Sequence, residues 1–517
     1  MEAVLMQGAA APARWRCVGE SSLAQAVAGG VVRFGVARRA AGAAVRARLG
    51  PARAHVSEER IKENAADGQV LEDDEAGAVR LFVGLPEDVV SADGRAVCRP
   101  RAVAAALRAL KLLGVDGVEL PVSWAVVQPG SGDWFEWAGY LAVARMVRDA
   151  GLALRVSLDT DGAALPGWAA DAAAADPDVL FADRSGNRRE GCLSFAVDEL
   201  PVLVGKSPLE AYEAFFRSFG DAFADFMGST ITDVTISLGP NGELRYPSYP
   251  PGRGGGDDYA GVGEFQCYDK YALAALKRHA ESAGQPMWGL SGPHDGPRYD
   301  ESPESCAFFR EHGGSWQTAY GEFFLCWYAG ELLAHGDRVL AAASRAFDGK
   351  PVQLSAKVPP LLNASRAAEA TAGLRGGYGP VVEMFARHAC TVIASGVDVR
   401  RGAVDELLAR IKDACAEHGT RLAAESAPLA VARDGGAWDA LLSGERTRPC
   451  QLTYQRMGAE FFGPEHWPLF VQFVHALEFP EEAHEDDLPA ASDDGEQLTV
   501  PSAASAAQAD AREVQTV

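Results

Sequence analysis

The amino-acid sequence predicts an α/β fold, most simply a (β/α)8 TIM barrel with a long insertion subdomain after its fourth strand and disordered termini. Short runs rich in β-branched residues alternate with segments whose apolar residues recur three and four positions apart, as βα units require. Eight such runs occur, and eight parallel strands close a barrel. Because a barrel with insertions can exceed about 400 residues, the 517-residue chain needs only one large domain.

The strand and helix candidates alternate along the chain. The strands are expected at residues 79–85, 115–121, 152–158, 232–238, 352–357, 390–394, 420–424 and 450–454. Amphipathic patterns predict helices at residues 102–113, 137–149, 209–226, 268–283 and 403–418. Helices between consecutive strands make the strands parallel, so residues just beyond each strand should surround one mouth of the barrel.

The connection between the fourth and fifth strands is the longest in the predicted barrel. It joins residue 238 to residue 352 and contains the polar, glycine- and proline-rich segments 249–264 and 289–304. This is too long for an ordinary loop. We therefore expect a subdomain over the active face.

The two ends of the chain differ in composition from the middle. Residues 1–55 carry eight arginines, no lysine and only two acids, which is typical of an organelle transit peptide, although an extension without an address is the alternative. Residues 56–78 form an acidic linker, and 79–478 form the barrel. The acidic tail 479–517 lacks aromatic residues and should be disordered.

Composition excludes several classes of function. The net charge of -23 argues against a nucleic-acid surface, whose affinity comes from lysine and arginine, and favours a neutral or cationic partner. No apolar run reaches the roughly 18 residues that span a bilayer, so no membrane association is expected. The nine cysteines include no Cys-x-x-Cys pair, so neither a disulfide framework nor a zinc site is indicated.

Five polar residues lie at or just after the ends of predicted strands and should surround the mouth: Glu243, Lys357, Ser395, Glu425 and Arg456. Two carboxylic acids serve glycoside cleavage, because one can protonate the leaving oxygen while the other activates water or attacks carbon. This chemistry requires no metal and no organic cofactor. The plainer alternative for Glu243, which stands in a Gly-Pro-Asn-Gly turn, is a solvated loop glutamate.

Long segments within residues 79–478 resemble the plant β-amylase family, glycoside hydrolase family 14. The matching segments are Gly-Val-Asp-Gly-Val at 114–118, Gly-Glu-Leu-Arg-Tyr-Pro-Ser-Tyr at 242–249, Gly-Glu-Phe-Gln-Cys-Tyr-Asp-Lys at 263–270, Phe-Phe-Leu-Cys-Trp-Tyr at 323–328 and Thr-Ala-Gly at 371–373. The resemblance implies an inverting hydrolase that releases maltose from the non-reducing ends of α-1,4-glucans.

The resemblance also implies roles for individual residues. Glu243 falls on the family's general acid and Glu425 on its general base. Positions that bind substrate in the family correspond to Lys357, Ser395, Ser426, Ala427 and Arg456, with Ser395 replacing a threonine. The resemblance implies no cofactor and no metal.

Three departures from the family pattern remove substrate contacts. Pro121 replaces an aspartate that holds a sugar hydroxyl, and Asp161 stands where a lid histidine belongs, in a much shortened lid segment. Leu362 falls in a segment that reads His-Trp-Trp in the family. Lost contacts and a lost lid reduce the binding energy that orients the scissile bond and let water enter the site.

These departures favour a member that is catalytically inactive or very weak. Within the family, the chain more closely resembles the non-catalytic chloroplast class called inactive β-amylase 9, through segments 81–86, 193–197, 292–295 and 453–459. That likeness implies a regulatory or glucan-sensing role in starch breakdown, a location in the chloroplast stroma and a regulatory protein partner. The alternatives are a slow maltose-releasing β-amylase and a hydrolase of a smaller or different glycan.

Overall fold

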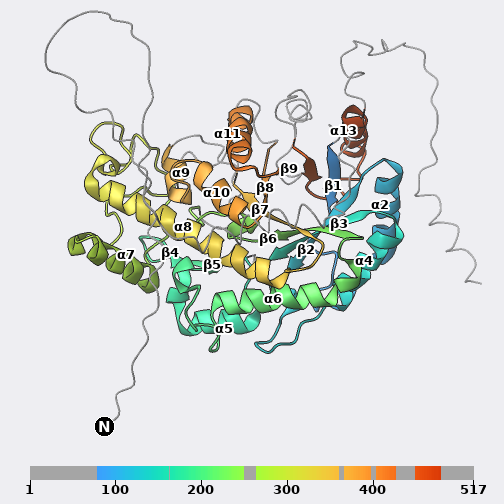
Figure 1. Cartoon of the computed structure of the whole chain (residues 1–517), viewed down its shortest axis with the longest axis horizontal. Coiled ribbons are helices and arrows are strands. Elements are labelled where there is room, and N and C mark those ends of the chain that lie inside the picture. The colour runs from blue at the N-terminus through green and yellow to red at the C-terminus, as the bar shows by residue number, and fades with distance from the viewer. Residues whose placement is uncertain are drawn as a thin grey trace, which may run out of the picture.

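A computed structural model describes residues 79–161, 164–249, 263–359, 366–397, 403–426 and 449–478. Eight parallel strands close into a barrel, and helices surround it (Figure 1). Around the barrel the order is β1-β2-β3-β6-β7-β8-β9-β10, and β10 pairs with β1 to close the ring. The predicted (β/α)8 barrel is therefore confirmed.

Each of the eight predicted runs forms one barrel strand. The strands are β1 (Arg80–Gly84), β2 (Gly117–Ser123), β3 (Ala153–Asp159), β6 (Ile231–Ile236), β7 (Gln353–Val358), β8 (Thr391–Ala394), β9 (Leu422–Glu425) and β10 (Gln451–Tyr454). Nearly all of their residues are buried, including all four residues in each of β8, β9 and β10. Such burial is expected of strands that have helices on one side and a filled barrel interior on the other.

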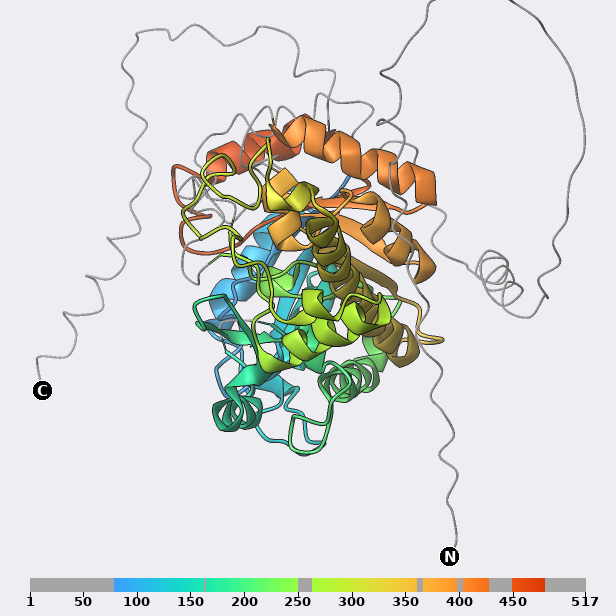
Figure 2. The same cartoon turned by 90° about the vertical axis from the view of Figure 1, so that its left-hand side faces the viewer.

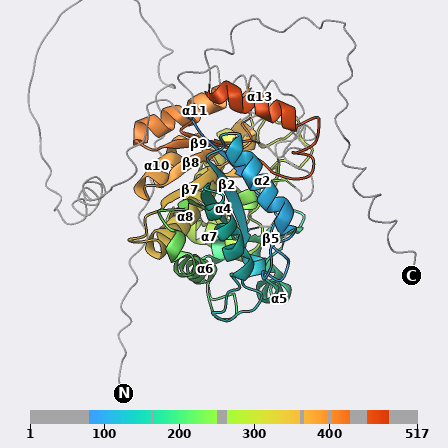
Figure 3. The same cartoon turned by 90° about the vertical axis from the view of Figure 1, so that its right-hand side faces the viewer.

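Helices cover the outside of the barrel. The longer ones are α2 (Pro100–Leu112), α4 (Ala138–Asp149), α5 (Gly167–Ala175), α6 (Pro208–Ala222), α7 (Lys270–Ser282), α8 (Ala319–Ala346), α10 (Gly379–Arg387), α11 (Ala403–His418) and α13 (Trp467–Glu478). Figure 3 shows α2 and α4 in front of β2, with α11 and α13 along the top. The five predicted helices correspond to α2, α4, α6, α7 and α11, whereas α5, α8, α10 and α13 were not predicted.

The start of α6 shows how local sequence fixes these helices. Ser207 Oγ accepts a hydrogen bond from the Glu210 backbone N–H at 3.2 Å, and the Glu210 carboxylate accepts one from the Ser207 N–H at 2.8 Å. This reciprocal capping box satisfies two N–H groups at the helix start. The inner face of α6 then places Phe215 and Phe219 against Trp137, just before α4, which joins two neighbouring helices of the outer layer.

The expected insertion after the fourth strand draws on two connections rather than one. The β6–β7 connection contains α7 and the 28-residue α8, and the β3–β6 connection contains a small sheet of β4 (Leu180–Ala182) and β5 (Arg188–Leu193). The Tyr268 N–H donates to the Ala182 carbonyl at 3.1 Å, which joins the two connections. Figure 2 faces the side of the molecule that carries α7 and α8. Both connections leave the carboxyl ends of strands, so they begin at the mouth.

The predicted ends of the chain lie outside the described residues. They are the leader 1–55, the acidic linker 56–78 and the tail 479–517. Their boundaries, and that of the domain 79–478, remain predictions.

Candidate active site

The five residues expected around the mouth all lie at the carboxyl ends of barrel strands. Lys357 is in β7, Glu425 ends β9, and Ser395 directly follows β8. Glu243 follows β6 after a short turn, and Arg456 comes two residues after β10. Glu243, Lys357, Ser395 and Glu425 are each less than a tenth exposed, so these side chains face the barrel interior rather than bulk solvent.

The turn that carries Glu243 lies directly beside Lys357. The Leu244 N–H donates to the Lys357 carbonyl at 3.0 Å, and Glu243 and Lys357 form an isolated parallel bridge. Gly239 permits the turn, since a Cβ there would lie 2.7 Å from the Glu243 carbonyl oxygen. Arg245 Nε donates to Glu243 Oε2 at 2.7 Å, which holds the carboxylate in place. A solvated loop glutamate is therefore not the arrangement found.

Lys357 joins the two proposed acids. Its Nζ lies 2.9 Å from Oε1 and 2.8 Å from Oε2 of Glu425. Glu243 and Glu425 therefore contact the same lysine, although they are far apart in the sequence. Glu243 does so through its backbone and Glu425 through its carboxylate. Burial opposes the charge of Lys357, but the carboxylates of Glu119, Glu425 and Asp159 outweigh it and raise the pKa of the ammonium.

Glu119 of β2 is a third buried carboxylate at this site, and sequence reasoning missed it. It is 1% exposed, its Oε2 accepts a hydrogen bond from Gln455 Nε2, and its Oε1 lies 3.6 Å from Lys357 Nζ. Gly84 makes room for this contact, since a Cβ there would lie 2.3 Å from Gln455 Oε1. The only signal for Glu119 in the sequence is that it is an acid between the apolar residues of Val-Glu-Leu at 118–120.

The carboxylates at the mouth have different proton affinities. Burial raises the pKa of Glu425, and the neighbouring Glu119 adds to this, while Lys357 opposes it. Burial also opposes the charge of Glu119, but Lys357, Arg456 and Arg155 outweigh it and lower the pKa. Burial raises the pKa of Asp159, at the end of β3, to about 6. The mouth thus holds more carboxylates than its lysine can neutralise.

The other proposed substrate-binding residues are in different situations. Arg456 Nη1 donates to the Leu85 carbonyl at 3.0 Å, at the rim beside β1. Ser395 Oγ is buried and makes no hydrogen bond within the described residues. Ser426 is also buried, and its Oγ accepts a hydrogen bond from the Gln455 N–H at 2.8 Å. Ala427 lies outside the described residues.

Two of the three departures from the family pattern can be placed. Pro121 is buried in β2, opposite Ser157 of β3, and offers no polar side-chain atom. Asp161 lies two residues beyond β3, where burial raises the pKa of its carboxyl to about 6 although the charge of His335 opposes the shift. Leu362 lies outside the described residues.

One layer deeper, the barrel interior contains a second ionic group. Arg155 Nε lies 3.2 Å from Asp233 Oδ1, and Arg155 Nη1 donates to Thr453 Oγ1 at 2.7 Å. The Ser355 hydroxyl also donates to Asp233 Oδ1, at 2.7 Å. Arg155 and Ser355 precede the mouth residues Asp159 and Lys357 on the same strands, so this group lies between the mouth and the barrel floor.

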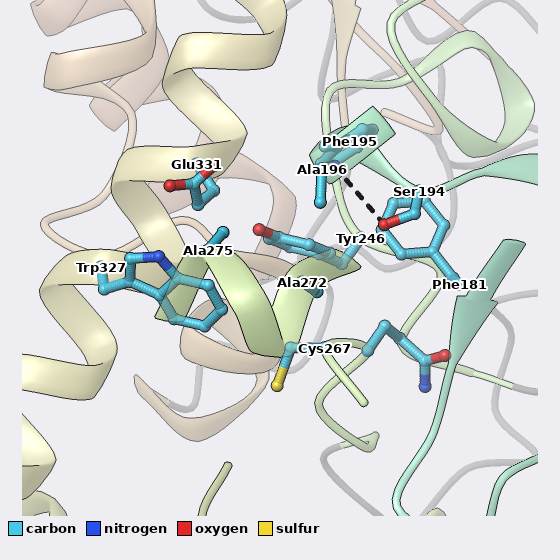
Figure 4. A pocket seen from close by; sticks show the side chains of 11 residues that line it. Phe181, Ser194, Phe195, Ala196, Tyr246, Cys267, Ala272, Ala275, Trp327 and Glu331 are labelled. Atoms are coloured by element: carbon cyan, nitrogen blue, oxygen red, sulfur yellow. Dashed lines mark hydrogen bonds between the residues drawn. The ribbon is translucent and has the colours of Figure 1, made fainter. Parts of the chain in front are cut away.

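A separate small cavity lies beside Tyr246 (Figure 4). Eleven residues line it, namely Phe181, Ser194, Phe195, Ala196, Tyr246, Gln266, Cys267, Ala272, Ala275, Trp327 and Glu331. Its lining includes none of the five mouth residues. Tyr246, three residues after Glu243, stacks on Tyr328 with ring centroids 3.8 Å apart, so this region supports the turn.

Metal-binding clusters and membrane-spanning helices are both absent from the described part of the chain. No group of three or more His, Cys, Asp or Glu side chains there is arranged to hold a metal ion. No helix in the same part of the chain is long and apolar enough to cross a membrane. The thiols of Cys192, Cys267, Cys306, Cys390 and Cys415 are buried and free.

Comparison with known proteins agrees with this geometry. The sequence profile of glycosyl hydrolase family 14 matches residues 82–481. Inactive beta-amylase 9 of Arabidopsis thaliana is 43% identical over 448 residues, which is 82% of each chain. Chloroplastic beta-amylase 2 of Oryza sativa subsp. japonica is 37% identical over 77% of each chain.

The barrel also matches a solved structure. The catalytic domain of beta-amylase from Paenibacillus polymyxa superposes with a TM-score of 0.63, covering 77% of this chain and 98% of that chain at 23% identity. At that identity the superposition supports the fold alone, whereas the profile and the plant relatives cover most of the chain. The chain therefore belongs to glycosyl hydrolase family 14.

Proposed function

We propose that this protein is a catalytically silent or very weak β-amylase homologue that senses glucan or regulates starch breakdown. The observation that carries the proposal is the state of its two acids. Glu425 contacts Lys357 through both carboxylate oxygens, and Glu243 is bound by Arg245. Each acid is therefore already in contact with a cationic side chain of its own chain.

The lost sugar contacts support the same proposal. Pro121 provides no hydrogen bond where the family has an aspartate, and the shortened segment 159–168, which contains Asp161, cannot supply the family's lid. Each lost buried polar contact costs about 1–3 kcal/mol, and each 1.4 kcal/mol is about tenfold in rate. At the middle of that range, about 2 kcal/mol each, two or three such losses reduce turnover by roughly a thousandfold to ten-thousandfold.

Two observations support glucan as the ligand. Membership of glycosyl hydrolase family 14 implies a glucan substrate. The buried Ser395 Oγ has no hydrogen-bond partner in the described residues, so it is available to a sugar hydroxyl. We also propose a regulatory protein partner, which is supported by the likeness to a relative named as inactive.

Maltose release from soluble starch tests the proposal. The full chain should release at least about a thousandfold less maltose than an active plant β-amylase assayed beside it. If the chain is silent, Glu243→Gln and Glu425→Gln should leave that background unchanged, because none of it depends on the two acids. The control is Glu87→Gln, because Glu87 is 81% exposed. Retention of the chain on amylose without turnover is expected.

The second candidate, a genuine maltose-releasing β-amylase, is favoured by the presence of both acids at one mouth. It predicts a different result in the same assay. Release that exceeds the blank and disappears in both acid variants, but not in Glu87→Gln, would replace the silent reading with this one.

We also propose that residues 1–55 direct the chain to the chloroplast stroma. Their arginine-rich, acid-poor composition and the names of chloroplastic relatives support this location. A fluorescent protein carrying residues 1–55 should enter plastids of leaf cells and be shortened by cleavage. Fluorescence that stays in the cytosol would contradict the proposal.

A further inference from the structure

At the mouth, the buried ammonium of Lys357 lies close to two buried carboxylates, those of Glu119 and Glu425. Lys357 Nζ lies 2.8 Å from Glu425 Oε2 and 3.6 Å from Glu119 Oε1. All three side chains are less than a tenth exposed. Neither of these two oxygens makes a hydrogen bond to another described residue, and among the described residues Lys357 is the cation within ion-pair distance of both.

Glu119 is held in this position by the strands around it. Gln455, just beyond β10, donates to the other oxygen of Glu119, which points Oε1 toward Lys357. Glu119 lies in the middle of β2, with Gly84 of β1 and Arg155 of β3 as its register partners. The carboxylate therefore sits on a rigid strand, not on a loop that could turn away.

The other charged groups around the pair come from three neighbouring elements. Asp159 ends β3, Glu243 follows β6 and is bound by Arg245, and Arg456 follows β10. Arg456 is directed to the rim, where its Nε is 3.7 Å from Glu87. Lys357 is thus the cation in direct contact with Glu425 among the described residues.

We propose that Glu119 is a positioning residue that shares Lys357 with Glu425 and so weakens Glu425 as a base. The inference rests on the proposed function, in which Glu425 occupies the general-base position. It explains how a chain that retains a carboxylate at the general-base position can still be catalytically inactive.

Glu119 and Glu425 compete for the single positive charge of Lys357. Two carboxylates and one ammonium leave an excess negative charge in a desolvated space, and the least costly relief is for one carboxylate to keep its proton. Glu119 has the hydrogen bond from Gln455 and the nearby Arg155, and its pKa is lowered, whereas burial and Glu119 raise the pKa of Glu425. A protonated Glu425 cannot accept a proton from water.

Infrared spectroscopy of the full chain tests this directly. The C=O band of a protonated carboxyl is followed with pH, and the spectrum of Glu425→Gln is subtracted to isolate Glu425. The same subtraction is made between Glu119→Gln and Glu119→Gln/Glu425→Gln. We expect the Glu425 midpoint to lie above the ordinary value of about 4.3 and to fall by about one pH unit or more once Glu119 is neutral.

The matched control is Glu87→Gln, which removes one negative charge near Arg456 without touching Lys357. The Glu425 midpoint in Glu87→Gln should equal the Glu425 midpoint in the unaltered chain. If Glu119→Gln does not fold, Glu119→Met is used in its place, because that variant also leaves Lys357 with a single carboxylate partner. The unaltered chain alone can refute the inference, because a Glu425 midpoint at or below about 4.3 overturns it.

Two other results would overturn the inference. They are an unchanged midpoint in the Glu119 variants and an equal shift in Glu87→Gln. None of these readouts uses maltose release. An active chain would refute the proposed function, and an unshifted infrared band would refute the role of Glu119.

Discussion

Asp233→Val is expected to lower the free energy of unfolding by about 3–5 kcal/mol, because it leaves Arg155 charged and unpaired inside the barrel. Arg155 is fully buried, and its Nε and Nη2 make no hydrogen bond within the described residues. Asp233 is its ion-pair partner, with 3.2 Å between Nε and Oδ1. The Ser355 hydroxyl loses the same acceptor. Urea denaturation followed by circular dichroism measures the loss.

The double variant Arg155→Met/Asp233→Val distinguishes two causes of the lost stability, namely the unpaired charge of Arg155 and altered packing around position 233. Replacing a whole buried ion pair with apolar residues of similar volume is often neutral or stabilising. We therefore expect the double variant to recover most of the stability lost in Asp233→Val. If it is as unstable as the single variant, packing around position 233, and not the unpaired guanidinium, accounts for the loss.

The strands were predictable because their signal is local. A parallel strand buried on both faces needs a short apolar, β-branched run bounded by polar residues, and each of the eight runs meets that requirement. The predicted and observed ends differ by no more than two residues, as for 420–424 against Leu422–Glu425. The mouth residues followed from the strands, since Glu243, Lys357, Ser395, Glu425 and Arg456 each come at or just after a strand end.

Elements defined by distant partners were missed. α8 buries residues on several sides, including the adjacent Trp327, Tyr328 and Ala329, so it lacks the single apolar stripe that identifies a surface helix. β4 has only three residues, and β5 begins with Arg-Arg-Glu. Their pairing depends on contacts with the β6–β7 connection, which the local sequence does not specify.

Glu119 shows the same limit within the site. An acid in an apolar strand marks a buried charge, but the sequence does not say which cation neutralises it. The answer depends on closure of the barrel, which brings β2 next to β1 and across the interior from β7. Only then do Lys357 and Gln455 become partners of Glu119, and only then is Lys357 seen to be shared.

Lys357→Met is expected to destabilise the chain by about 3–5 kcal/mol at pH 8. Without the ammonium, Glu119 and Glu425 are buried carboxylates that lack their common counter-ion, and the pKa of each rises in the folded state. In the unfolded state both titrate near 4.3. The folded variant therefore holds protons that the unfolded chain has released, so its stability must fall as pH rises.

The pH dependence distinguishes this mechanism from loss of packing. The deficit of Lys357→Met relative to the unaltered chain should be clearly smaller at pH 5 than at pH 8, and Lys357→Met/Glu119→Gln should recover part of it. Lys206→Met is the matched control, because Lys206 pairs with an 86% exposed Asp133. Its effect should stay below about 1 kcal/mol and not vary with pH. A deficit in Lys357→Met that is equal at both pH values would mean that the lysine stabilises the barrel by its aliphatic stem and not by its charge.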